Sequence, residues 1–133
     1  MVGLKRTLIL LLAAMFLVAC GNVKIHENVD EQVAKDSMQV MDRIIYNIDK
    51  DIPIEDVEDD DHELFERFTN KYIDKSDTIP VDLEGVDKSV NVMASGSLVK
   101  YAKGASLESD KEDIKESYDT MIEFIETGKA AGE

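Results

Sequence analysis

Nine consecutive residues near the middle of the chain form an acidic run with the chemistry to bind a cation. Seven of the nine residues from Glu55 to Glu63 carry a carboxylate, and no Lys or Arg lies among them. Carboxylate oxygens are the ligands that hard cations such as Ca²⁺ prefer. The closest alignment to an EF-hand loop begins at Asp49, but it places Pro53 at the fifth position and Ile54 where glycine is needed. The run therefore indicates either an irregular cation-binding segment or the start of a helix, where free N–H groups favour negative charge.

A histidine inside this run is the second candidate for chemistry. His62 follows Glu58 by four residues and Asp59 by three, so a helix would place all three side chains on one face. Together with Asp61 they are the candidate metal ligands of the chain. The alternative is a surface histidine in an acidic neighbourhood, and we favour this alternative. We therefore predict no metal site and no cofactor.

One sequence pattern is shared with catalytic proteins. Ser97-Leu98-Val99-Lys100 has the S-x-x-K spacing of penicillin-recognising serine enzymes, in which serine is the nucleophile. The S-D-N and K-T-G motifs of those enzymes are absent, as are G-x-S-x-G, H-E-x-x-H and C-x-x-C. We therefore predict that the protein is not an enzyme. We expect Ser97 to face the core and to donate a hydrogen bond to a carbonyl of the preceding turn.

The N-terminal residues have the pattern of an export signal. Lys5 and Arg6 precede twelve apolar residues, Leu8 to Ala19. This stretch is shorter than the roughly 17–25 residues of a membrane-spanning helix and matches the apolar region of a signal peptide. The run Leu17-Val18-Ala19-Cys20 resembles the lipobox of bacterial lipoproteins. The resemblance implies cleavage before Cys20, the only cysteine of the chain, and a diacylglyceryl thioether on its sulfur.

This resemblance also implies a location and a domain organisation. Residues 1–19 would be the signal peptide, 20–27 the lipidated cysteine with a short tether, and 28–133 one acidic domain. Two acyl chains give stable membrane attachment, whereas one gives only marginal binding. The expected location is the extracytoplasmic face of the cell membrane. An ordinary secretory signal or an uncleaved anchor remains the alternative.

Charge excludes one class of partner. The chain has 29 acidic and 15 basic residues, a formal net charge of −14. Such a domain is repelled by nucleic acid phosphates and by anionic lipid headgroups. We therefore expect a non-enzymatic interaction module that binds a membrane or cell-surface protein, for example in an exclusion or inhibitor role. The alternative is a lipoprotein that binds a small ligand or a cation through residues 55–63. The oligomeric state is left open.

The groups described above must be positioned by the secondary structure. Apolar residues recur at helical spacing along the chain, and this spacing predicts an all-α bundle of about four helices. The first helix is expected from an Asn28 cap to near Asp51, because Pro53 prevents continuation. The second is expected to begin near Asp60. The last is expected to begin at a Ser109 cap and to end at Gly128.

The third expected helix, residues 86–103, is apolar on two sides. Val92 and Val99 oppose its main apolar stripe, so we expect it to be covered on both sides at the centre of the bundle. Two aromatic residues, Tyr46 and Phe124, lie off or at the edge of their helical stripes. They are candidate anchors for a partner, or the margin of the core.

Overall fold

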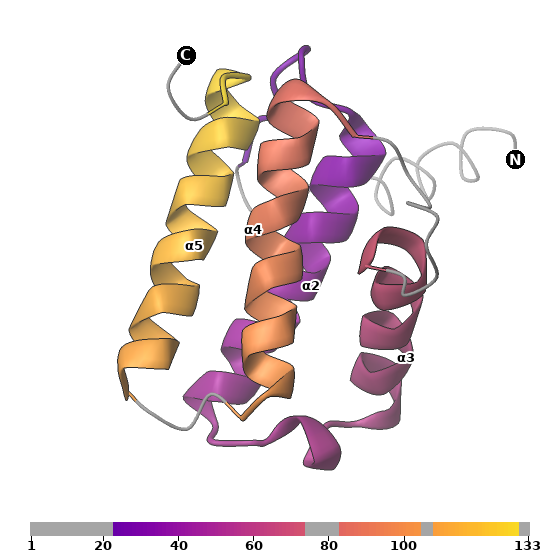
Figure 1. The fold of residues 1–133 in the computed structure, drawn as a ribbon, viewed down its shortest axis with the longest axis vertical. Coiled ribbons are helices and arrows are strands. Elements are labelled where there is room, and N and C mark those ends of the chain that lie inside the picture. Colours follow the sequence, from indigo (N-terminus) through magenta and orange to yellow (C-terminus); the bar gives the residue numbers. More distant parts are fainter. Residues whose placement is uncertain (1–22, 74–82, 105–107, 131–133) are drawn as a thin grey trace, which may run out of the picture.

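The computed structural model describes residues 23–73, 83–104 and 108–130, and all regular structure in these ranges is helical (Figure 1). The elements are α2 (Glu31–Asp49), a 3₁₀ turn η1 (Ile54–Asp56), α3 (Asp59–Phe68), a π-helical turn η2 (Thr69–Ile73), α4 (Gly85–Ala102) and α5 (Glu108–Thr127). The predicted small all-α bundle is confirmed. None of these helices is long and apolar enough to cross a membrane. The predicted signal peptide and Cys20 lie outside the described residues.

The first helix begins two residues later than its sequence suggests. The cap is Asp30, whose Oδ1 accepts a hydrogen bond from the Val33 N–H at 3.0 Å. Asn28 is not the cap, because it lies in a turn in which its own N–H donates to His26 Nδ1 at 3.1 Å. The predicted capping box at Asn28 is therefore wrong, although the helix that it was expected to begin is present.

Helices α2 and α4 run in the same direction, and polar contacts join them at both ends. Near their starts, the Asp30 N–H donates to Asp87 Oδ1 at 2.8 Å. Near their ends, the Tyr101 hydroxyl donates to the Ile52 carbonyl at 2.5 Å. Helix α5 returns antiparallel to them, and α4 packs against both α2 and α5 (Figure 1). The apolar side chains between the helices are buried, including Met41, Ile44, Val90, Ile114, Met121 and Ile125.

The expected covering of α4 on two opposite sides is only half right. Its main stripe is buried, but Val92 is 52% exposed and Val99 is 38% exposed. The reason is geometric: α2 and α5 both pack on the inner side of α4, and α3 lies on the side of the bundle away from α5, where it packs against α2 (Figure 1). The outer side therefore faces solvent.

The last helix starts slightly earlier than predicted, and it ends at the predicted residue. It begins at Glu108, so Ser109 lies within the first turn. Gly128 ends the helix in the left-handed conformation, with φ +66°, and its N–H donates to the Phe124 carbonyl at 2.9 Å. The predicted glycine C-cap is confirmed.

The described part of the expected tether packs on the bundle. Val23 and Ile25 lie against the core, and the His26 N–H donates to the Ile125 carbonyl at 2.9 Å. The His26 ring lies over Gly128, where an added Cβ would be 2.2 Å from His26 Nδ1. The domain thus includes residues before position 28, and its first described residues are held to the end of α5.

Gly128→Ala tests this contact. We expect a loss of unfolding free energy of about 2–4 kcal/mol, because the new methyl group meets both a left-handed backbone and the imidazole. Gly85→Ala is the matched control, since Gly85 has φ +58° but nothing within 4 Å of its added Cβ. Urea unfolding followed by circular dichroism gives both values. Equal losses at the two glycines would show that the His26 ring does not restrict position 128.

Candidate functional site

The acidic run is divided between two short elements rather than gathered around a cavity. Glu55 and Asp56 lie in η1, whereas Asp59, Asp60 and Asp61 form the first turn of α3. Negative charge in a first turn is stabilised by the helix dipole and by free N–H groups. This part of the run therefore has the arrangement expected of a helix start.

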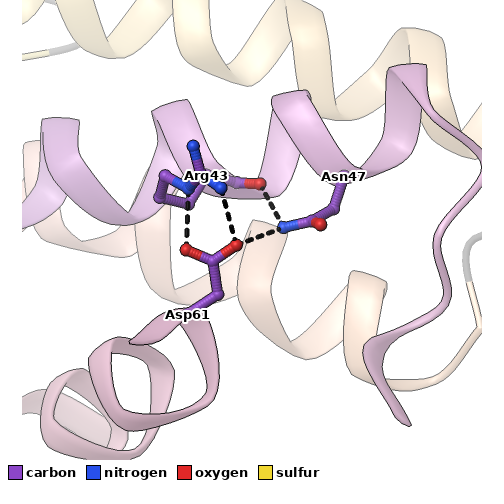
Figure 2. Close-up of polar contacts among 3 residues, drawn as sticks. All are labelled: Arg43, Asn47 and Asp61. Carbon is purple, nitrogen blue, oxygen red and sulfur yellow. Dashed lines mark hydrogen bonds and ion pairs between the residues drawn. The ribbon is translucent and has the colours of Figure 1, made fainter. Parts of the chain in front are cut away.

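Asp61 differs from its neighbours because it points into the protein (Figure 2). Arg43 of α2 binds it with two hydrogen bonds, Nε to Oδ1 at 2.7 Å and Nη2 to Oδ2 at 2.9 Å. Asn47, one turn further along α2, donates from Nδ2 to Asp61 Oδ2 at 3.0 Å and to the Arg43 carbonyl at 2.8 Å. The Asp61 side chain is 7% exposed. This bidentate ion pair fixes the start of α3 against α2.

The Arg43 hydrogen bonds also set the charge of this carboxylate. They hold the pKa of Asp61 below its ordinary value of 3.8, against the effect of burial, and Asn47 acts in the same direction. A carboxyl whose pKa is lower in the folded state contributes stability above its unfolded pKa. That contribution is lost as the pH falls through the folded pKa. Asp61 therefore stays ionised and paired under ordinary conditions.

The four candidate metal ligands do not form a ligand set. Glu58, Asp59 and His62 are exposed, while Asp61 is buried and paired with Arg43. Among residues 23–73, 83–104 and 108–130, no group of three or more His, Cys, Asp or Glu side chains is placed to hold a metal ion. The geometry of the acidic run thus gives no support to the alternative of a cation-binding segment.

Ser97 and Lys100 are each engaged with a different partner. The Ser97 hydroxyl is buried and donates to the Met93 carbonyl at 2.8 Å, which confirms the predicted back-bond. Lys100 Nζ pairs with Asp113 Oδ2 of α5 at 3.3 Å. A serine nucleophile needs a base within hydrogen-bond reach and an accessible oxygen. Here the Ser97 hydroxyl is bonded within α4, and Lys100 links α4 to α5.

A second polar network, around Asp36, was not predicted from the sequence. Asp36 of α2 accepts hydrogen bonds from Lys71 Nζ at 2.8 Å, from the Tyr72 hydroxyl at 2.6 Å and from Gln32 Nε2 at 2.7 Å. Burial raises the pKa of Asp36, but the three hydrogen bonds outweigh it and the pKa is lowered. Burial and the bond to Asp36 raise the pKa of Tyr72 to about 12. The network ties η2 to α2, and no spacing rule reveals a pair so far apart in the sequence.

The two aromatic candidates have different environments. Phe124 is buried in the core, so of its two predicted roles the core margin is confirmed and the partner anchor is not. Tyr46 is 41% exposed, and the Arg43 guanidinium lies 4.2 Å from its ring centre, with Lys50 Nζ at 5.0 Å. The tyrosine ring is therefore already stacked with cations of its own helix.

A further surface feature is the solvent-facing side of α4, which carries two exposed valines. We call it the α4 outer face and define it by five exposed residues: Lys88, Val92, Gly96, Val99 and Lys103. Beside it, between α4 and α5, lies a shallow groove of about 180 Å³. Its lining residues are Val92, Met93, Gly96, Ser97, Lys100, Ile114 and Ser117.

Removal of the Asp61 carboxylate tests the first network. We expect Asp61→Asn to lower the free energy of unfolding at pH 7 by about 2–3 kcal/mol, because Arg43 loses a buried charged partner. The difference from the parent protein should shrink as the pH falls below the ordinary Asp value of 3.8.

Asp113→Asn is the matched control for this substitution. Asp113 also pairs with a cation, Lys100, but its side chain is 58% exposed. We expect a loss below about 1 kcal/mol. Urea titrations at several pH values measure both variants, and a pH-independent difference for Asp61→Asn would contradict the assigned charge state.

Comparisons with protein families, with curated proteins and with solved structures each found no match to this chain. The function must therefore be inferred from its own residues.

Proposed function

We propose that this protein is a lipoprotein held on the extracytoplasmic face of the cell membrane by lipid on Cys20. We further propose that it acts without catalysis, as an interaction module that binds a membrane or cell-surface protein. An exclusion or inhibitor role is an example of this class. The observation that carries the proposal is the lipobox-like run Leu17–Cys20 after a basic and apolar leader.

The short distance between the proposed anchor and the bundle supports a partner at the membrane. Val23 is already packed against the core, and it lies only three residues after Cys20. Three extended residues reach about 10 Å. This is less than half of the roughly 25 Å that a seven-residue tether would reach. The domain would therefore lie close to the headgroups, beside the exposed portions of membrane proteins.

The charge of the domain supports a protein rather than the lipid surface as the partner. With a formal net charge of −14, the chain is repelled by anionic headgroups, so the acyl chains alone would supply attachment. Two of the groups considered for chemistry have structural partners: Asp61 binds Arg43, and the Ser97 hydroxyl donates to the Met93 carbonyl. This arrangement favours a binding role over an enzymatic one.

Cys20→Ser tests the anchor. In cells fed radiolabelled palmitate, the parent protein should incorporate label and the variant should incorporate none, because serine lacks the sulfur that forms the thioether. Lys24→Ala, four residues away, is the matched control and should remain labelled. Label retained by Cys20→Ser would overturn the lipoprotein assignment.

A spacer tests whether closeness to the membrane matters. Insertion of about fifteen Gly and Ser residues after Asn22 should leave palmitate labelling unchanged and extend the mean reach by roughly 20 Å. If the partner is a membrane protein near the bilayer, the yield of crosslinks to it in intact cells should fall several-fold. Parent chains that crosslink only to copies of themselves would contradict the proposed binding function.

A further inference from the structure

We propose that the α4 outer face is the surface by which this protein binds its partner, and that it receives an apolar helix flanked by acidic side chains. This inference rests on the proposed function as an interaction module. It adds the place of binding and the chemistry of the partner.

The first support is the gathering of exposed apolar side chains. Three large hydrophobic residues are exposed within the described ranges, and two of them, Val92 and Val99, belong to this face. They are seven residues apart, which places them one above the other on a helix. Both are β-branched and stiff, so ordering them on binding costs little side-chain entropy. Neither valine is part of the buried core of this protein.

The second support is the shape of the face. Gly96 lies between the two valines, it is exposed, and no atom lies within 4 Å of the position that its Cβ would take. The distance between packed helices depends on the size of the side chains at their contact. A glycine between two short side chains therefore permits a close approach of a partner helix. The groove of about 180 Å³ beside Gly96 leaves room for one of its side chains.

The third support is charge. The only carboxylate of α4 is Asp87, which is half-buried and accepts the Asp30 N–H, whereas α5 carries eight acidic residues against two lysines. The α4 outer face has no acidic residue and has a lysine at each end, Lys88 and Lys103. On an acidic protein this face would attract carboxylates that the neighbouring surfaces repel.

The same lysines argue against a second copy as the occupant. If two α4 outer faces met in a parallel arrangement, Lys88 would lie opposite Lys88 and Lys103 opposite Lys103. In an antiparallel arrangement Lys88 would lie opposite Lys103. Like charges meet in both cases, which disfavours pairing. An acid-flanked helix of another protein satisfies the apolar centre and both charged ends.

Photocrosslinking in intact cells locates the binding surface on the full-length protein. The photoreactive residue p-benzoylphenylalanine would be placed at Val99 on the α4 outer face, and at exposed Glu63 of α3 and Glu123 of α5 as matched controls. We expect an adduct from position 99 and at least about tenfold less from the controls, because p-benzoylphenylalanine reacts only with groups in contact with it and hot-spot contacts cluster at the centre of an interface. Mass spectrometry of the crosslinked peptide should place it in an apolar helix with flanking Asp or Glu.

A pair of substitutions of opposite charge tests the chemistry of the partner. Val92→Asp should lower the adduct yield from position 99 about tenfold or more, while Val92→Lys should lower it much less, because only the aspartate repels an acid-flanked helix. Position 92 is 52% exposed, so both variants should keep the melting temperature of the parent protein within about 4 °C. Equal losses of adduct from the two variants would overturn the acidic character of the partner.

The outcomes separate this inference from the proposed function. Adducts to another protein from Glu63 or Glu123 alone would overturn the α4 outer face and leave the interaction module standing. An adduct from position 99 to a second copy of the chain would overturn the heterologous partner. Absence of adducts from all three positions would overturn the α4 outer face as the binding surface, while the palmitate labelling and the spacer test the proposed function separately.

Discussion

The hold of Arg43 and Asn47 on Asp61 is the interaction on which the arrangement of α3 depends. Helix α3 has only ten residues, which is too short for a helix to be stable alone in water. The charged pair fixes its first turn to α2, after which Leu64, Phe65 and Phe68 can enter the core. The Asp36 network then holds η2 at the other end. The carboxylates of Asp61 and Asp36 thus join α3 and η2 to α2.

The chain has one cysteine, so no disulfide within the chain can hold the bundle, and packing must do so. Helix α4 is central to that packing because both α2 and α5 lie against it. Since its two neighbours share its inner side, the outer side is left open. The exposed valines are a result of this topology: the helix at the centre of the packing also carries two of the three exposed large apolar side chains of the described residues.

Periodicity was sufficient to predict the helices, because burial repeats every three to four residues whatever the neighbours are. Gly128 and Ser97 were placed correctly because their roles are local, a left-handed cap and a bond to the preceding turn. Val92 and Val99 were misplaced, since a helical pattern reveals apolar sides but not whether a partner covers them. The inward turn of Asp61 and the contacts of Asp36 depend on residues brought together only by the tertiary fold.

The contact between His26 and the end of α5 has a consequence for folding. It joins residues about a hundred positions apart, and closing so long a loop carries an entropic cost that must be met before the contact helps. A chain is synthesised from its N-terminus, so His26 emerges well before its partners, Ile125 and Gly128. The segment around His26 therefore stays undocked until α5 has been made. Closure of the bundle then coincides with the completion of its final helix.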